Sequence, residues 1–160
     1  MQITPNLWFD RQAEQAAEFY VSIFPNSRIL GTTRYPEGAP GPAGEVMTVD
    51  FELAGQRFTG INGGPHFTFD EAVSFLVPCA DQAEVDRYWD ALLEGGGTTS
   101  QCGWLKDRFG LSWQVVPDGM DELLADADPE RAQRAMQAML GMVKLDVAAL
   151  RAAADGVPAA

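Results

Sequence analysis

Residues 102–117, CGWLKDRFGLSWQVVP, contain two short strand-forming stretches separated by a polar turn. Residues 111–116 alternate, with Leu111, Trp113 and Val115 on one face and Ser112, Gln114 and Val116 on the other. Asp107 to Gly110 have the composition of a type I turn in which glycine permits a positive φ. The segment therefore predicts two adjacent strands whose apolar face packs on a helix, leaving Gln114 on the opposite face.

The residues before this segment predict a strand and then a helix. AVSFLVPC (72–79) is typical of a strand in which Val73, Phe75 and Val77 face the core. DQAEVDRYWDALLEGGG (81–97) predicts a helix with Asp81 as N-cap, Glu84 three residues on, and glycines at its end.

The same order of elements is found in the first part of the chain. The pattern predicts a strand at 3–9, a helix at 11–24, a strand at 27–35, a Pro/Gly loop at 36–44 and a hairpin at 45–63 that turns at Ala54-Gly55. QAE occurs at 12–14 and at 82–84, an offset of 70, and Phe58 matches Trp113 at an offset of 55. At the first offset Ala13 matches Ala83 within this motif, and two further pairs match: Phe19 with Trp89, and Ile23 with Leu93. The Pro/Gly loop at 36–44 accounts for most of the difference between the two offsets. The sequence therefore predicts two tandem βαβββ modules.

Beyond Pro117 the pattern is helical. Asp128 is a predicted N-cap with Pro129 at the first helical position, and Asp146 is a predicted cap of a last helix. One apolar stripe follows helical spacing: Ala132, Ala135, Met136, Met139, Leu140 and Val143. Ordinary packing is favoured over a methionine-rich binding surface. We expect a domain at 1–118, with modules at about 1–64 and 70–118, and a helical extension at 119–160.

Composition restricts the possible partners. The chain of 160 residues has 11 basic and 23 acidic side chains, a net charge of -12, which argues against nucleic-acid and anionic membrane partners. No apolar run approaches the ~20 residues of a membrane span, and the N-terminus lacks the pattern of a signal peptide. We expect a cytoplasmic protein in which Cys79 and Cys102 are reduced.

Four blocks in order resemble a known family: residues 7–29, 61–75, 81–96 and 102–117. They look like the PhnB-like (demethylubiquinone methyltransferase-like) branch of the vicinal oxygen chelate superfamily, which includes glyoxalase and bleomycin-resistance proteins. The resemblance implies an α+β fold in which two tandem βαβββ modules form a curved mixed sheet around a cleft, followed here by C-terminal helices. It also implies a homodimer. In superfamily enzymes, His and Glu from the first and last strands of each module hold a divalent metal.

The matching positions in this chain are neutral. They are Asn6, Asn62, Ser74 and Gln114, with glutamine where the superfamily's metal-binding members have glutamate. Neutral amides and hydroxyls are poor ligands for zinc or nickel, so we expect no metal and no cofactor. Together with Trp8, Cys102 and Trp104 these residues are the predicted ligand-binding cleft.

The catalytic candidates are weak. His66 is the only histidine and lies in a predicted linker, and Cys102 would neighbour Trp104 by strand alternation. Gly63-Gly64 either let a ligand approach the backbone or simply form the linker. The first strand runs into LWFDRQAEQ without a glycine, which argues against a SAM-dependent methyltransferase.

The sequence thus favours a PhnB-like protein that binds an unidentified small molecule in a metal-free cleft, and leaves open whether it is an enzyme. One alternative is a small-molecule enzyme that uses His66, Cys102 or an unrecognised metal site. Another is a dimeric interaction module that uses the methionine-bearing C-terminal helices.

Overall fold

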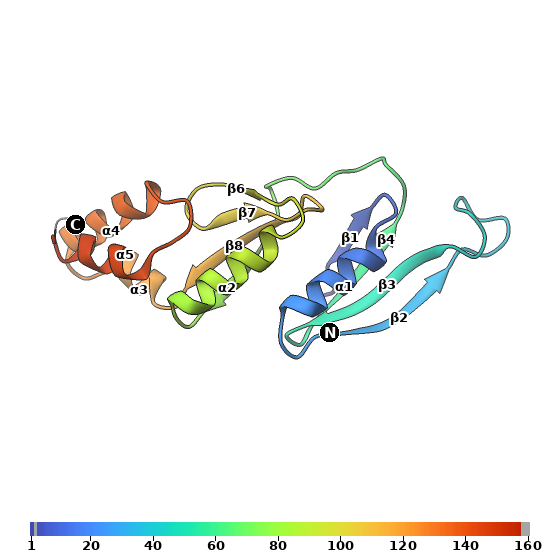
Figure 1. Ribbon diagram of the computed structural model, residues 1–160, viewed down its shortest axis with the longest axis horizontal. Coiled ribbons are helices and arrows are strands. Elements are labelled where there is room, and N and C mark those ends of the chain that lie inside the picture. Colours follow the sequence, from blue (N-terminus) through green and yellow to red (C-terminus); the bar gives the residue numbers. More distant parts are fainter. Residues whose placement is uncertain (2, 158–160) are drawn as a thin grey trace. The chain divides into compact units, whose positions relative to one another are not determined.

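A computed structural model describes residue 1 and residues 3–157. The chain divides into two compact units, Met1–Phe69 and a second unit from Asp70 onward. In each unit one long helix lies along one face of a four-stranded sheet (Figure 1).

The first unit contains one helix and four strands: β1 (Asn6–Phe9), α1 (Ala13–Ile23), β2 (Arg28–Arg34), β3 (Val46–Leu53) and β4 (Gln56–Asn62). The strand order is β1-β4-β3-β2. β1 is parallel to β4, and the other two pairs are antiparallel. The predicted hairpin turn is confirmed, with Ala54 at φ 47° and Gly55 at φ 88°.

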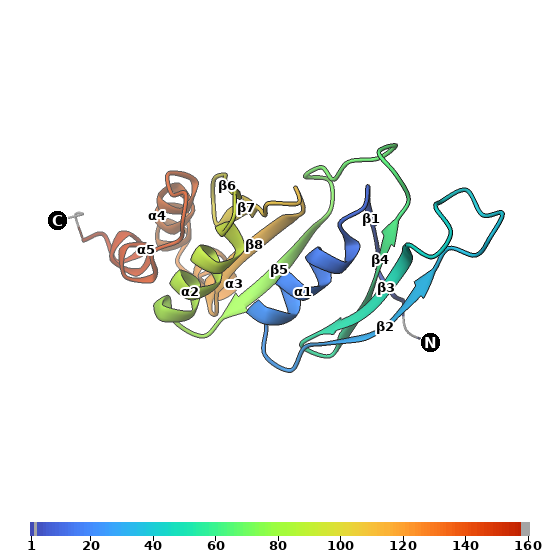
Figure 2. The same cartoon turned by 45° about the vertical axis from the view of Figure 1, so that its right-hand side comes forward.

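The second unit repeats this arrangement with β5 (Ser74–Cys79), α2 (Gln82–Leu93), β6 (Thr98–Thr99), β7 (Trp104–Lys106) and β8 (Ser112–Pro117). The strand order is β5-β8-β7-β6, and β5 runs parallel to β8 as β1 does to β4 (Figure 2). The registers agree: Leu7 pairs with Gly60, and Val77, 70 residues after Leu7, pairs with Val115, 55 residues after Gly60. The prediction of two tandem βαβββ modules is therefore confirmed.

Capping explains where α2 begins. The Asp81 carboxylate accepts a hydrogen bond from the Glu84 amide at 2.9 Å, and the Glu84 carboxylate accepts one from the Ala80 amide at 3.0 Å. Gly95 and Gly96 follow the helix at φ 80° and 116°, conformations that strain other residues. The predicted N-cap and the glycine end are confirmed.

Alternating apolar residues face the helix in each unit. In the first unit Phe51 stacks on Phe58 with ring centroids 5.4 Å apart, and in the second Trp113 and Val115 are buried. The predicted alternation of residues 111–116 is confirmed, because Leu111 is buried on the same face. Val73 was expected in the core but is 64% exposed, because β5 begins only at Ser74.

The C-terminal part forms α3 (Met120–Leu124), α4 (Pro129–Leu140) and α5 (Val147–Ala154), which cluster beside the end of β8 (Figure 1). The predicted caps Asp128 and Asp146 are confirmed, and α3 lies in the predicted helical extension, although no separate helix was predicted there. A small core of Met120, Leu145 and Leu150 holds the cluster, and Met139, Met142 and Val116 pack against it. Residues 158–160 of the predicted extension lie outside the described residues. Within the described part, no helix has the length and apolar character of a membrane span.

Candidate functional site

Each sheet has one face packed on its helix and one turned away from it, which we call the open face. In the second unit, strand alternation places eight side chains on the open face: Ser74, Leu76, Pro78, Trp104, Lys106, Ser112, Gln114 and Val116. Of these, Ser112 is buried and Val116 packs against the core of the C-terminal helices. Leu76 is 57% exposed, whereas its neighbour Val77 is buried against the helix side. This open face therefore offers polar, aromatic and aliphatic groups to a ligand.

Gln114 and Trp104 are direct partners across β8 and β7. The Gln114 side-chain amide donates to the Ser74 hydroxyl at 2.9 Å, which orients the amide on the sheet. Within the described residues the Gln114 Oε1 and the Trp104 indole N–H form no hydrogen bond, although the indole N–H groups of Trp8 and Trp113 both do. A hydrogen-bond acceptor and a donor thus lie free on adjacent strands beside a half-buried indole ring.

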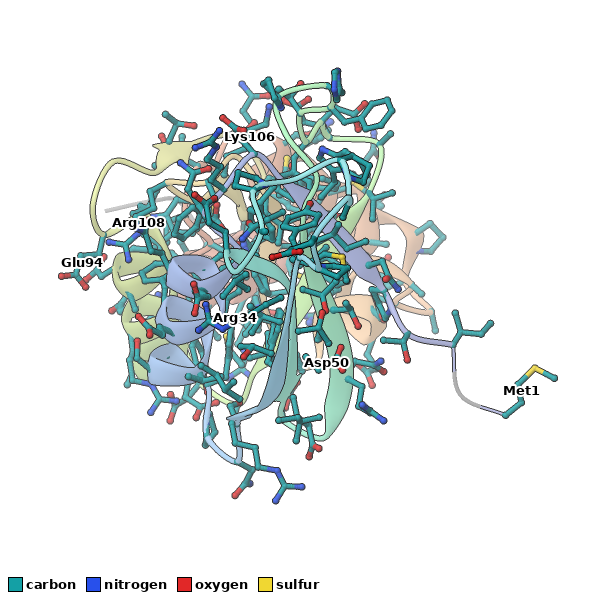
Figure 3. The ribbon with its side chains drawn as sticks, turned by 90° about the vertical axis from the view of Figure 1, so that its right-hand side faces the viewer. Met1, Arg34, Asp50, Glu94, Lys106 and Arg108 are labelled. Atoms are coloured by element: carbon teal, nitrogen blue, oxygen red, sulfur yellow. The ribbon has the colours of Figure 1, made fainter. Side chains whose placement is uncertain are left out.

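Lys106, labelled in Figure 3, supplies the cation of this open face. Its ammonium forms an ion pair with Glu71 at 2.5 Å, and the hydrogen bond from Lys106 lowers the pKa of Glu71 below its usual value. Because Lys106 is paired with Glu71, the hydrogen-bonding groups that remain free on this open face are the neutral ones of Gln114 and Trp104.

The open face of the first unit contains Asn6 and Trp8 of β1, which pair with Thr59 and Ile61 of β4. Trp8 donates from its indole nitrogen to the Gly64 carbonyl at 2.8 Å. Its ring meets Phe67 edge-to-face with the ring centroids 5.0 Å apart. The predicted alternation of β1 is confirmed, since Leu7 and Phe9 are buried.

The Trp8 ring also explains the Gly63-Gly64 pair. A Cβ at position 63 would collide with the indole ring, and Gly64 has φ 88°. The glycines therefore allow residues 63–64 to fold over Trp8.

Asn62 was expected on the open face beside Asn6 and Trp8. This prediction is wrong, because the register of β4 differs by one residue from the predicted one. The strand pairing places Thr59 and Ile61 on the open face, so Asn62 faces the helix and is 9% exposed. Its Oδ1 accepts from the Ala13 amide at 2.9 Å and its Nδ2 donates to the Val46 carbonyl at 3.0 Å. Asn62 therefore caps α1, for which the N-cap residue Gln12 provides no side-chain hydrogen bond.

Cys102 was expected on a strand next to Trp104, but β7 begins only at Trp104. Cys102 lies in a turn with φ 58°, and its amide donates to the Met142 carbonyl at 2.8 Å. Strand alternation therefore does not determine its direction. Cys102 belongs to the second unit and His66 to the first, where His66 is exposed.

Asp107 was predicted as a turn residue, but the sequence did not predict that its side chain holds neighbouring groups. It is 3% exposed, and its Oδ1 accepts from the amides of Phe109 and Leu111 at 2.8 and 3.1 Å. Its Oδ2 accepts from the Trp113 indole nitrogen at 2.8 Å. The predicted turn is confirmed, with Gly110 at φ 87°, and Asp107 also orients the strand that carries Gln114.

The metal-bearing pattern of the superfamily can be tested against these donors. Gln114 directs its amide nitrogen at Ser74, and Thr59, 55 residues before Gln114, donates its hydroxyl to Asp50 at 2.6 Å. Asn6 likewise donates its amide to the Thr4 carbonyl. These neutral, partly committed groups do not fit a divalent transition metal. Among the described residues, no three His, Cys, Asp or Glu side chains converge on a possible metal position.

Comparisons with known proteins agree with the fold. The model of a family described as 3-demethylubiquinone-9 3-methyltransferase matches residues 1–116. The structure of a putative 3-demethylubiquinone-9 3-methyltransferase, PhnB protein, from Bacillus cereus is 35% identical with a TM-score of 0.66, and the match covers 73% of this chain and 99% of that one.

Two more distant structures share the fold. A possible glyoxalase from Bacillus cereus has a TM-score of 0.50 at 14% identity, with 72% of this chain and 97% of that chain covered. The fosfomycin resistance protein FosX from Mesorhizobium loti has a TM-score of 0.57 at 13% identity, with 78% and 97% covered. No curated protein matches the sequence.

The two βαβββ units have the fold of the glyoxalase-like and fosfomycin-resistance structures named above. The chain belongs to the PhnB-like family described as 3-demethylubiquinone-9 3-methyltransferase. The family match ends at residue 116, so α3 to α5 lie outside it.

Proposed function

We propose that this PhnB-like protein binds a neutral, planar small molecule non-covalently on the open face of its second unit. The observation that carries the proposal is the free donor and acceptor of Trp104 and Gln114 on paired strands. An amide or lactam group would fill both hydrogen-bonding positions, accepting from the indole N–H and donating to the Gln114 Oε1. Leu76 supplies exposed apolar surface on the same open face.

The expectation of a neutral ligand follows from the charges. Lys106 is paired with Glu71, and the other open-face groups of β5, β7 and β8 are uncharged. A charged ligand would have to compete for the Lys106–Glu71 pair or leave its own charge unpaired, which costs desolvation energy. The open face of the first unit carries charge, because Thr59 donates its hydroxyl to the Asp50 carboxylate, which pairs with Arg57.

Methyl transfer from SAM, suggested by the name of the family, is not part of this proposal. SAM-dependent methyltransferases usually bind the cofactor at a glycine-rich loop between the first strand and helix of a doubly wound sheet. Here Asp10, Arg11 and Gln12 connect β1 to α1, and each sheet has one parallel pair and two antiparallel pairs.

We further propose a cytoplasmic homodimer as the working form. The two free cysteines and the net charge of -12 support a reducing compartment without nucleic-acid or membrane partners. The family resemblance supports the dimer. Sedimentation equilibrium tests this part, and a monomer at micromolar concentration would contradict it.

Ligand binding can be tested with ¹⁵N-labelled protein and three probes of similar size: benzamide, the lactam 2-piperidone and the anion benzoate. We expect the neutral probes to shift the Trp104 indole N–H resonance. Gln114→Ala should weaken that binding about five- to tenfold through loss of a hydrogen bond. Gln56→Ala, at an exposed glutamine of the first unit, is the matched control. Stronger binding of benzoate than of benzamide, or neutral probes that leave the Trp104 signal unchanged, would contradict the proposal.

A further inference from the structure

A charged cavity lies entirely within the first unit, and Asn62, Gly63, Gly64 and His66 are among its lining residues. Its volume is about 550 Å³, a size suited to a small metabolite. The start of α1, the ends of the long β2–β3 loop and the segment after β4 form its walls. We call it the α1 cavity.

Defined contacts hold the loop wall of the α1 cavity in place. The Tyr35 hydroxyl donates to the Asn62 carbonyl, and Gly41 packs directly against the Tyr35 ring. Arg34, labelled in Figure 3 at the end of β2, donates to the Gly44 carbonyl at 2.8 Å. The Gly44 amide in turn donates to the Tyr35 carbonyl at 2.9 Å. The wall is therefore fixed to β4 through Asn62.

The arginines of the α1 cavity are unusual for this chain. Most Lys and Arg side chains form ion pairs: Arg28, Arg57, Arg87, Lys106, Arg131, Arg134 and Lys144. Within the described part of the chain, Arg11 and Arg34 form none, although both line the α1 cavity. Both side chains are exposed, and Arg34 donates one N–H to the Gly44 carbonyl, so the remaining guanidinium N–H groups are available to a ligand.

Carboxylates line the α1 cavity as well. They belong to Asp10, Glu14 and Glu45, and none of them forms an ion pair in the described structure. The cavity thus presents both signs of charge without mutual neutralisation. A simple anion would face the carboxylates, and a simple cation would face the arginines.

We propose that the α1 cavity binds a zwitterion, namely an α-amino acid with an apolar side chain. Its carboxylate would bind the guanidinium groups of Arg11 and Arg34, a geometry that arginine favours. Its ammonium would bind the carboxylates of the same cavity. Tyr35, Pro40 and Pro42 provide rings in the lining against which an apolar side chain can pack.

The test uses a matched series that differs only in charge: L-phenylalanine, 3-phenylpropanoate and 2-phenylethylamine, measured by titration calorimetry at neutral pH. We expect L-phenylalanine to bind at least about tenfold more tightly than either singly charged analogue, because each lacks one set of charged hydrogen bonds. Equal or stronger binding of an analogue, or no heat with L-phenylalanine, L-leucine and L-methionine, would overturn the proposal.

Two variants locate the amino acid. Arg11→Gln and Arg34→Gln should each weaken the binding of L-phenylalanine about tenfold or more through loss of a charged hydrogen bond. Arg57→Gln, at an exposed arginine paired with Asp50 in the same unit, should bind like the unmodified chain. In ¹⁵N spectra, L-phenylalanine should shift the Gly63 and Gly64 amides and leave the Trp104 indole unchanged. The reverse pattern would overturn the α1 cavity without contradicting the open-face proposal.

Discussion

Asn62 connects three segments of the first unit. Its side chain binds the Ala13 amide and the Val46 carbonyl, and its own carbonyl accepts from the Tyr35 hydroxyl. The residue therefore joins the start of α1, the start of β3 and the wall of the α1 cavity.

We expect Asn62→Ala to lower the free energy of unfolding by about 2–4 kcal/mol, because it leaves a buried donor and a buried acceptor without partners. Urea unfolding followed by circular dichroism measures the change. Asn6→Ala is the control, since the exposed Asn6 bonds only the nearby Thr4 carbonyl, and it should cost less than about 0.5 kcal/mol. Equal stabilities of the two variants would contradict the capping role of Asn62.

The two cysteines differ in environment. Cys79 is fully buried, and burial, with Glu84 and Asp118 nearby, raises the pKa of its thiol to about 11. Cys102 is partly exposed. At pH 8 we therefore expect one thiol per native chain, that of Cys102, to react with Ellman's reagent, and both to react in guanidinium chloride.

The same pKa has a consequence for stability. The unfolded chain loses the Cys79 proton near pH 9 and the folded chain near pH 11, so stability should fall as the pH rises across that interval. Cys79→Ala should reduce this fall. Rapid reaction of both thiols in the native protein at pH 8 would contradict the assignment.

The C-terminal helices are attached to the second unit by specific bonds from α2. Gln82 donates to the Leu145 carbonyl at 3.2 Å and accepts from the Val147 amide at 2.8 Å. Lys144 pairs with Asp86 at 2.7 Å, which lowers the pKa of the Asp86 carboxyl and raises that of Lys144. α2 is thus packed on its sheet and also anchors the segment that begins α5.

We expect Gln82→Ala to loosen this attachment, because two backbone groups lose their partner. Stability should fall by about 1–2 kcal/mol, and amide exchange should accelerate at residues 142–150 before it does in β8. Hydrogen exchange with mass spectrometry measures both. Gln133→Ala, at an exposed residue of α4, is the control. Unchanged exchange at residues 142–150 would show that Gln82 does not hold the extension.

At the scale of the molecule, the sequence predicts what depends on local pattern. The Asp81 cap, the Ala54-Gly55 turn and the two-module order each arise from residues close in sequence or repeated at a fixed offset. The contact between Asn62 and α1 spans 49 residues, so no local pattern identifies it. Alternation failed at Cys102 because the strand had not yet begun there. The α1 cavity depends on how the 36–44 loop folds back, which its Pro/Gly composition does not specify.

We expect the metal content of the protein to depend on the side chains that could act as metal ligands on the two open faces. Gln114 and Thr59 occupy corresponding positions in the two units and are neutral, as are Asn6 and Ser74. The Asp50 carboxylate beside Thr59 already accepts from that hydroxyl and pairs with Arg57, so the cost of dehydrating a divalent cation is not recovered. Protein purified without added metal and dialysed should therefore contain far less than one equivalent of transition metal per chain by elemental analysis.

Gln114→Glu extends this test. A single added carboxylate still lacks the further anionic or imidazole donors that a transition-metal site requires, so we expect the variant to remain metal-free after incubation with nickel or zinc and dialysis. One retained equivalent in the unmodified chain would contradict the neutral-donor argument. Retention by the variant alone would show that glutamine at position 114 is what keeps the metal of the superfamily from binding here.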